Sequence, residues 1–333
     1  MVTTVPDFEA LDQEQQVQRL ELLGRNALGQ FGVKPLEVTS LEHAENTTFK
    51  VVTSDGAYCL RIHRPGYQSF ESIHSELEWL SAIRRDTQLA VPDPQISLRG
   101  ELVVRASVVE VPEERNCVLF QWLEGEFLRE PTPEQFRRLG RAMAQLHEHA
   151  LHWNRPADFT RHFLDDTGMY NEDSDKALLT ASELISDEDR ELVKRIAEES
   201  RALMRQLGKG PEVYGLIHGD LHRGNFLFEG ETIKLIDFDD CGFAHYLYDF
   251  AASLAYQLRF EDFEGTRDAL FDGYESIRPL PPHTRECLSQ FLRLRFHGIV
   301  KWVLDRGDNP KMRERGRDFI SHLLEGIQQT YKL

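Results

Sequence analysis

The spacing of apolar residues in the first third of the chain predicts two helices and a small antiparallel sheet. Apolar side chains recur at the helical period in residues 8–31 and again in residues 69–85. Between these segments, residues 48–53 and 57–62 have the composition of strands. Ser54-Asp55-Gly56 separates the two runs, and Asp-Gly between strands favours a tight turn. We therefore expect a β-hairpin that is followed by a helix.

A second hairpin and one more strand complete this predicted sheet. Arg99-Gly100 lies between the strand-like segments 95–98 and 101–104, so we expect these two segments to pair with each other. Residues 117–123 form a short apolar run that ends at Glu124-Gly125. The first third of the chain is thus predicted to be a small antiparallel sheet with one helix inserted.

From Thr132 onward the pattern of apolar residues is mostly helical. Thr132-Pro133 is a helix start signal, and residues 134–149 carry an apolar stripe. Further helical patterns cover residues 177–207, 248–258, 260–274, 283–305 and 311–331. A chain of 333 residues is long enough for two lobes. We predict an α+β protein with a small N-terminal sheet lobe, residues 1–123, and a larger, mainly helical lobe, residues 124–333.

Composition narrows the classes of partner. The net charge of −17 argues against a nucleic-acid binder, and it either suits a cationic substrate or reflects solubility alone. Four scattered cysteines without a Cys-x-x-Cys pair point to reduced thiols rather than to zinc or disulfides. The first residues lack the charged and apolar regions of an export signal, and no apolar run has the ~20 residues that span a bilayer. We expect a cytoplasmic protein with neither nucleic acid nor membrane as partner; its oligomeric state is left open.

One polar stretch interrupts the helical half. Residues 216–228 carry Asp220 and Asn225 between short apolar segments, and Asp237 follows the next apolar run. Each acid alone could be an ordinary turn or cap residue. Together they have the spacing of the kinase catalytic loop, in which the Asp receives a proton and the Asn binds metal. Mg²⁺ needs only one or two carboxylates beside phosphate and water, and Asn225 with Asp237 meets that requirement.

These residues resemble the aminoglycoside phosphotransferase/choline kinase family of protein-kinase-like enzymes. The resemblance rests on His218-Gly-Asp-Leu-His-Arg-Gly-Asn225, Ile236-Asp-Phe-Asp239 and Tyr248-Asp-Phe-Ala251, and it extends over roughly residues 36–274. It implies a bilobal protein-kinase-like fold that binds ATP and Mg²⁺ in the cleft between the lobes. Residues 45–51, 58–65, 75–80 and 119–125 are most similar to the bacterial stress-response kinase A branch, which phosphorylates protein Ser/Thr.

The resemblance implies a role for each matching residue. Asp220 would be the catalytic base, and Asn225 and Asp237 would bind Mg²⁺. Arg61 stands where the family has the strand lysine that holds the nucleotide phosphates, and Glu76 would be its ion-pair partner. Arginine keeps the charge but presents a planar fork instead of a compact ammonium. A surface ion pair is the alternative for these two residues.

The remaining nucleotide contacts would come from a loop and a hinge. The expected phosphate loop, residues 43–48, has no glycine, so Asn46, Thr47 and Thr48 would offer main-chain and hydroxyl donors, unless they form an ordinary polar turn. The hinge, with Gln121 and Leu123, would meet the adenine through its backbone.

Other polar residues are assigned supporting or alternative roles. His218 and Asp249 are predicted to stabilise the catalytic loop through hydrogen bonds. Asp239 and Asp240 would touch metal or substrate, or lie at a solvated loop edge. His147, His149 and His152 are not spaced to face one metal ion. An acidic substrate mouth, or else a solvated charge run, is predicted at Asp165, Asp166, Glu172, Asp173 and Asp175.

The predicted function is transfer of the ATP γ-phosphate to a hydroxyl acceptor. The acceptor is left open between a small molecule (an alcohol, amino alcohol or aminoglycoside) and a protein Ser/Thr. His222 stands where protein kinases have lysine, and small-molecule relatives commonly have histidine there, which favours a small molecule. The alternative from another class is a catalytically silent, kinase-like module that senses a nucleotide or binds a partner.

Overall fold

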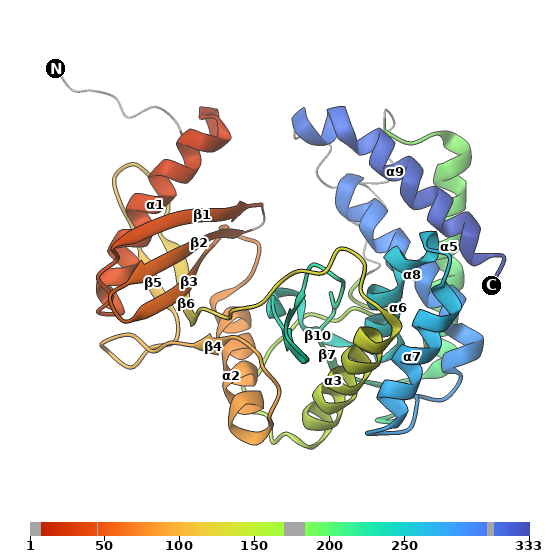
Figure 1. Cartoon of the computed structure of the whole chain (residues 1–333). Helices are drawn as coiled ribbons and strands as arrows, with labels where there is room; N and C mark the ends of the chain where they lie inside the picture. The colour runs from red at the N-terminus through yellow and green to blue at the C-terminus, as the bar shows by residue number, and fades with distance from the viewer. Residues whose placement is uncertain (1–7, 45, 170–183, 305–309) are drawn as a thin grey trace. The chain divides into compact units, whose positions relative to one another are not determined.

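The computed structural model describes residues 8–44, 46–169, 184–304 and 310–333 (Figure 1). The chain divides into two compact units. The first contains Met1–Gly125 and Arg155–Thr160, and the second contains Glu126–Asn154 and Arg161–Leu333. An antiparallel sheet in the first unit and mainly helices in the second confirm the predicted α+β class.

The first unit is built on one antiparallel sheet with the strand order β1-β2-β3-β6-β4, in which β5 also pairs with β6. Its strands are β1 (Glu37–His43), β2 (Asn46–Thr53), β3 (Gly56–His63), β4 (Asp93–Pro94), β5 (Val104–Ala106) and β6 (Arg115–Gln121). Strands β2 and β3 form the predicted hairpin, with Thr53 opposite Gly56. The turn requires a φ of 146° at Gly56, which glycine adopts without steric cost.

The predicted second hairpin is wrong, although its turn exists. The Ser97 N–H donates to the Glu101 carbonyl at 2.8 Å, and Gly100 has a φ of 84°. The flanking strands β4 and β5 do not pair with each other, because each pairs with β6. Local spacing could not reveal this pairing, because both segments pair with β6, a longer buried strand that follows them in the sequence.

The helices of the first unit begin and end close to the predicted positions. They are η1 (Phe8–Ala10), α1 (Gln13–Gln30) and α2 (Phe70–Asp86). Asp12 begins α1 with a capping box, in which its carboxylate accepts from the Gln15 N–H and the Gln15 side chain accepts from the Asp12 N–H. Leu23 of α1 is fully buried in the core that also contains Leu60 of β3. Gly24 permits this close approach, because a Cβ there would lie 2.8 Å from Leu60 Cδ2.

The second unit is mainly helical and contains two small two-stranded sheets. Its helices are α3 (Pro133–His152), α5 (Asp187–Leu207), η2 (Phe238–Asp240), α6 (Leu247–Leu254), η3 (Ala255–Arg259), α7 (Phe263–Glu275), α8 (Thr284–Leu304) and α9 (Pro310–Thr330). Its strands are β7 (Tyr214–Ile217), β8 (Phe226–Glu229), β9 (Thr232–Leu235) and β10 (Gly242–His245). β7 pairs with β10, and β8 pairs with β9, both antiparallel. The predicted alternation of short strands and polar loops in residues 216–239 is therefore confirmed.

Helices α3 and α7 pack closely through two glycines. A Cβ on Gly140 would lie 2.1 Å from the Leu270 carbonyl oxygen, and one on Gly273 would lie 1.9 Å from the Arg137 carbonyl oxygen. Side chains at either position would force the helices apart. The contact fixes α3, which carries His147, and this histidine contacts Asp249 of α6.

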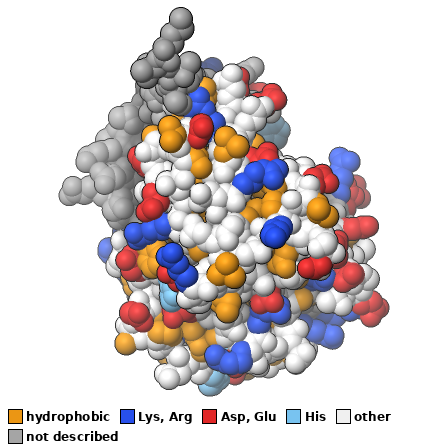
Figure 2. All heavy atoms as spheres, turned by 90° about the vertical axis from the view of Figure 1, so that its left-hand side faces the viewer, with side chains coloured by type: hydrophobic (Ala, Val, Ile, Leu, Met, Phe, Trp, Pro, Cys, Tyr) orange, Lys and Arg blue, Asp and Glu red, His pale blue; other side chains and the backbone are white. Residues whose placement is uncertain are grey.

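One face of the molecule is drawn as spheres in Figure 2. Figure 2 shows acidic and basic side chains interspersed on that face rather than gathered by sign. Within the described ranges, every helix is too short or too polar to cross a bilayer.

Candidate active site

The polar loop after β7 is held by the buried carboxylate of Asp249. The main-chain N–H groups of His218 and Gly219 donate to Asp249 Oδ2 and Oδ1 at 3.0 and 2.8 Å. Gly219 has a φ of 84°, and a Cβ there would lie 2.3 Å from the Asp240 carbonyl oxygen. The loop thus turns sharply at Gly219 and presents Asp220, as predicted for the structural roles of His218 and Asp249.

A third donor to Asp249 comes from α3. His147 Nε2 lies 3.0 Å from Asp249 Oδ2, and His147 Nδ1 lies 3.0 Å from the Tyr274 hydroxyl. Burial lowers the pKa of His147, so its neutral ring donates through Nε2 and accepts the tyrosine proton at Nδ1. The sequence showed only a histidine on an apolar helix face, and this supporting role was missed.

His218 also connects the loop to the segment that carries Asp237. Its Nε2 lies 2.9 Å from the carbonyl of Ile236, and its Nδ1 lies 3.4 Å from the Asp220 N–H. Burial lowers the pKa of His218, so the neutral ring donates at Nε2 and accepts at Nδ1. One imidazole therefore sets the positions of both acids relative to each other.

Asp220 is surrounded by donors. The Asn225 amide donates to its Oδ2 at 2.9 Å, and Arg295 Nη2 of α8 forms an ion pair with its Oδ1. His222 Nε2 lies 3.4 Å from Oδ2. Burial alone would raise the pKa of Asp220, but Arg295, through its charge and its hydrogen bond, together with His222 and His218, holds that pKa below its ordinary value. The carboxylate is ionised at neutral pH and can accept a proton.

Asn225 and Asp237 are brought together by the β8–β9 hairpin. Asn225 precedes β8, and its carbonyl accepts from the Ile236 N–H at 2.9 Å, directly before Asp237. Asp237 has φ 62° and ψ 68°, a left-handed conformation that costs free energy in a residue other than glycine. Its side chain is exposed. An exposed carboxylate beside an amide suits a divalent cation that keeps water and phosphate ligands.

The segment after Asp237 is held by Arg161 and His162. Arg161 is buried and donates to the carbonyls of Cys241, at 2.6 Å, and Asp239. His162 Nε2 lies 3.1 Å from the Asp240 carbonyl. The Asp239 side chain is buried, so the expectation of a solvated loop edge is wrong for this residue. Sequence spacing missed Arg161, because the loop that carries it lies 78 residues away from Asp239.

In the first unit, Arg61 and Glu76 form the expected ion pair. Arg61 Nη2 lies 2.9 Å from Glu76 Oε1 and 2.7 Å from Oε2. The two residues are 5% and 0% exposed, which excludes the alternative of a surface pair. The Arg61 guanidinium carbon lies 5.1 Å from the centre of the Phe120 ring. The Arg61 guanidinium is thus fixed by Glu76 of α2.

The other residues predicted to bind nucleotide lie in the same sheet. Asn46, Thr47 and Thr48 form the start of β2, where Thr48 lies opposite Arg61 on β3. Thr47 is buried, and its hydroxyl lies 2.7 Å from His43 Nδ1. Gln121 ends β6, and its side-chain amide donates to the Ala57 carbonyl at 3.0 Å. Leu123 is partly exposed in the segment that follows β6.

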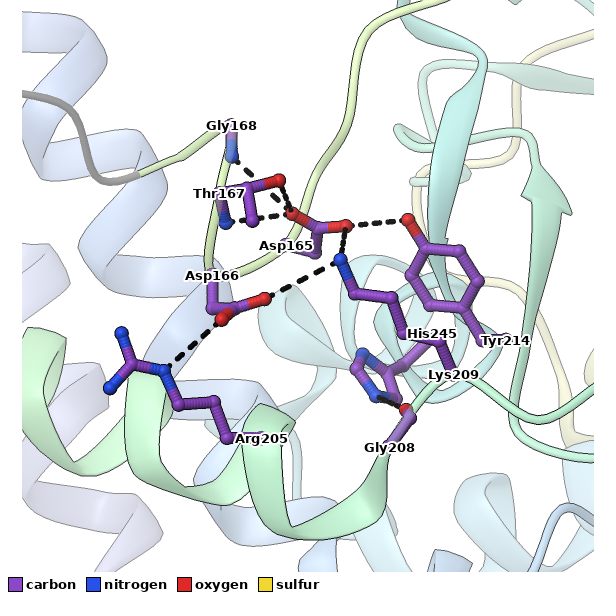
Figure 3. Close-up of polar contacts among 9 residues, drawn as sticks. All are labelled: Asp165, Asp166, Thr167, Gly168, Arg205, Gly208, Lys209, Tyr214 and His245. Carbon is purple, nitrogen blue, oxygen red and sulfur yellow. Dashed lines mark hydrogen bonds and ion pairs between the residues drawn. The ribbon is translucent and has the colours of Figure 1, made fainter.

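The expected acidic mouth is a closed ion-pair network at Asp165 and Asp166 (Figure 3). Asp165 is fully buried between Lys209 Nζ at 2.8 Å and the Tyr214 hydroxyl at 2.5 Å, and its other oxygen accepts from Thr167. Burial would raise the pKa of Asp165, but these donors hold it below its usual range. Asp166 contacts Lys209 and Arg205. The substrate role is therefore wrong for Asp165, and Glu172, Asp173 and Asp175 lie outside the described residues.

No arrangement of three or more His, Cys, Asp or Glu side chains suits a metal within the described ranges. His147, for which the sequence predicted no metal shared with His149 and His152, belongs to the hydrogen-bond chain at Asp249. A metal at this site would therefore depend on the sparse pair Asn225 and Asp237.

Fold and site together define a protein-kinase-like phosphotransferase. The model of the phosphotransferase enzyme family matches residues 37–287, which is more than half of the chain, and the chain belongs to this family. The predicted enzyme class, a phosphotransferase with an alcohol group as acceptor, is confirmed. The stress-response kinase A branch stays a prediction.

Individual relatives cover most of the chain. Amicoumacin kinase of Bacillus subtilis (strain 168) is 24% identical over 297 residues, 84% of this chain and 84% of that protein. Homoserine kinase of Methylobacterium nodulans is 28% identical over 276 residues, 79% of each protein. The structure of the microcompartment-associated aminopropanol kinase has a TM-score of 0.77 at 29% identity, covering 93% of this chain and 94% of that one.

A second solved structure has the same fold at lower identity. Amicoumacin kinase hAmiN, in complex with AMP-PNP, Ca²⁺ and Ami, has a TM-score of 0.76 at 22% identity. It covers 97% of this chain and 95% of that one.

Proposed function

We propose that this protein transfers the γ-phosphoryl group of ATP, with Mg²⁺, to the hydroxyl of a small molecule. The observation that carries the proposal is the arrangement of Asp220, Asn225 and Asp237. An ionised carboxylate is held by the Asn225 amide, and a hydrogen bond from His218 connects it to the residue before Asp237. A proton acceptor beside two oxygen ligands for a hard cation is the equipment that phosphoryl transfer needs.

Asp220 is the proposed catalytic base. The oxygen of the acceptor hydroxyl forms a bond to the γ-phosphorus, its proton passes to Asp220, and the bond from that phosphorus to the bridging oxygen breaks, which releases ADP. The depressed pKa of Asp220 keeps it ionised, so it is ready to orient the hydroxyl and receive the proton late in the reaction. Asn225 and Asp237 would hold Mg²⁺, which neutralises charge on the phosphate oxygens.

Nucleotide binding is assigned to the first unit. Arg61 is proposed to contact the phosphates, with Glu76 fixing its guanidinium. Asn46, Thr47 and Thr48 at the start of β2 are proposed to contribute phosphate donors. Gln121 and Leu123 are proposed to lie at the adenine. The pairing of Thr48 with Arg61 across β2 and β3 supports a common location for the phosphate contacts.

A small-molecule acceptor is favoured over a protein serine or threonine by His222. Its Nδ1 accepts from the Gly224 N–H at 2.9 Å, and burial lowers its pKa, so the ring is neutral at pH 7. A lysine at this position would supply a full positive charge. The amicoumacin, homoserine and aminopropanol kinases named above also support a small hydroxyl compound. The cytoplasmic location stays a prediction.

The proposal is tested by supplying γ-labelled ATP with a panel of hydroxyl metabolites and aminoglycosides, alongside a basic protein and the enzyme itself. We expect label on a small molecule, only when Mg²⁺ is present, and none with Asp220→Asn. Label on the basic protein alone, or on the enzyme alone, would show that the acceptor is a protein and not a small molecule. Absence of Asp220-dependent ATP turnover would contradict the whole proposal.

A further inference from the structure

Arg295 is the buried cation in contact with the proposed base. It lies on α8, its side chain is 11% exposed, and its Nη2 pairs with Asp220 Oδ1. Its Nε has no hydrogen-bond partner among the described residues. The guanidinium carbon is 6.0 Å from the centre of the Tyr248 ring. A guanidinium carries five donors in a fixed plane, and the contacts with Asp220 and Tyr248 leave further donors for one more anionic group.

The ion pair occupies the oxygen that an acceptor hydroxyl would use. Asp220 Oδ2 accepts from the Asn225 amide at 2.9 Å, so the open lone pairs lie mainly on Oδ1, where Arg295 binds. Burial would lower the pKa of Arg295, but the charge of Asp220 raises it above its ordinary value, so the guanidinium stays charged. An anion that binds the same guanidinium would weaken the ion pair between Arg295 and Asp220 Oδ1. Oδ1 could then accept a hydrogen bond from the acceptor hydroxyl.

We propose that Arg295 determines acceptor specificity by binding a carboxylate of the acceptor. The preferred acceptors are then hydroxy acids and hydroxy amino acids rather than amino alcohols. The inference rests on the proposed function, because it names the substrate class of the same site. A planar guanidinium matches a carboxylate through two parallel hydrogen bonds, which is the strongest pairing available to Arg295.

The local charge also disfavours a cationic acceptor. In a small amino alcohol the ammonium group is only two or three carbons from the hydroxyl, so it would lie close to Arg295 whenever the hydroxyl contacts Asp220. A hydroxy amino acid carries the same ammonium group, but its carboxylate offsets that charge and binds Arg295. The Asp220 charge is already compensated by Arg295. The net charge of −17 attracts a cation, but screening limits that attraction to roughly 8 Å. Within the site, the positive charge of the Arg295 guanidinium therefore determines whether a cationic acceptor binds.

The test uses acceptor pairs that differ only by a carboxylate. These are homoserine and 3-amino-1-propanol, threonine and 1-amino-2-propanol, and serine and ethanolamine. The full-length enzyme is assayed for ADP release with ATP and Mg²⁺, and kcat and KM are obtained separately for each compound. For each pair with a member that the enzyme phosphorylates, we expect the acid to have a kcat/KM at least about tenfold higher than the amino alcohol. This factor corresponds to the free energy of one hydrogen bond to a charged group.

Three variants separate binding from folding. Arg295→Gln should abolish the preference for the acid, mainly by raising its KM, and Arg295→Lys should retain part of it. Arg285→Gln removes the same charge from an exposed position of α8 and should leave the preference unchanged. Melting temperatures establish that each variant is folded; if Arg295→Gln is not, the wild-type ratios and Arg295→Lys carry the test.

Three results overturn the inference while the proposed function stands. The first is an amino alcohol that is used as well as, or better than, its acid. The second is a preference that Arg295→Gln leaves unchanged. The third is Asp220-dependent ATP turnover without transfer to any of the three acids. If no Asp220-dependent turnover of ATP occurs with any hydroxyl compound, the proposed function fails, and the inference fails with it.

Discussion

The side-chain amide of Asn225 donates to two atoms of Asp220, its main-chain carbonyl and its carboxylate oxygen Oδ2, each at 2.9 Å. Both bonds use the amide nitrogen, which leaves the amide oxygen for the proposed metal ion. A single residue thereby orients the proposed base and can contribute to the proposed metal site. This explains why a spacing of five residues between Asp220 and Asn225 carries so much of the function.

Replacing Asp220 with asparagine should remove turnover and preserve nucleotide binding. The amide is nearly the same size but cannot accept the hydroxyl proton, so we expect kcat to fall by about 10²–10⁴-fold. Steady-state ADP release gives kcat, and calorimetry gives the nucleotide Kd. Asp268→Asn, at an exposed position, serves as the control. A kcat near that of the wild type would exclude Asp220 as the base.

Breaking the Arg61–Glu76 pair from one side should destabilise the protein strongly. Arg61→Ala leaves a buried carboxylate without its cation, a change that costs about 3–5 kcal/mol. The double variant Arg61→Met/Glu76→Leu removes both charges and should recover most of that loss, although nucleotide affinity stays low. Urea unfolding of the full chain measures the stability. If the single and double variants are equally unstable, the ion pair is not the cause.

Stability should fall between pH 6.5 and pH 4 because of His297. This residue is 2% exposed on α8, and burial, helped by the charges of Lys301 and Arg201, lowers its pKa to about 4. The unfolded chain, with a histidine pKa of about 6.5, binds the proton more readily, so each decrease in pH below 6.5 favours unfolding. The contribution of neutral His297 to the free energy of unfolding is fully present above pH 6.5, and roughly 2 kcal/mol of it is lost by pH 5.

The free energy of urea unfolding at pH 7 and pH 5 checks this effect. His297→Leu should show a smaller difference between the two pH values than the wild type. His283→Gln, at an exposed position, should keep the wild-type difference. An unchanged difference in His297→Leu would mean that other groups cause the pH dependence.

Asp165 should matter for stability and not for the acceptor. Asp165→Asn loses the charge that pairs with Lys209 and Tyr214, and we expect a loss of about 1–3 kcal/mol in the free energy of unfolding. Tyr214→Phe removes a single donor and should cost less. The acceptor KM should stay within about twofold of wild type in both. A large rise in the acceptor KM, with stability retained, would show that Asp165 contributes to acceptor binding, which its ion-pair network contradicts.

The elements that the sequence predicted well are those set by local patterns. The helices α1, α2 and α3 begin at Asp12, Ser69 and Thr132, each a capping residue followed by an apolar stripe. The hairpin of β2 and β3 follows from Asp55-Gly56, which needs no distant partner. Asp220, Asn225 and Asp237 could be predicted to lie together for the same reason, since one β-hairpin and its flanking loops hold all three.

The features that sequence reasoning missed depend on contacts between distant segments. Arg295 is 75 residues from Asp220 and sits in a helix whose pattern predicts only burial. Strands β4 and β5 pair with β6 because it is buried and longer than either, which local alternation cannot reveal. Asp165 lies in an acidic, irregular segment that suggests exposure, and only Lys209 and Tyr214, more than forty residues later, make its burial possible.

The most direct test of the central claim is transfer of the ATP γ-phosphate by Asp237→Asn as Mg²⁺ is increased. In the wild type we predict no transfer without Mg²⁺ and a saturable rise as it is added, while Asp268→Asn behaves like the wild type. Asp237→Asn should bind ATP with little dependence on Mg²⁺ and transfer phosphate at least about 100-fold more slowly. A wild-type rate and Mg²⁺ dependence in Asp237→Asn would contradict the account.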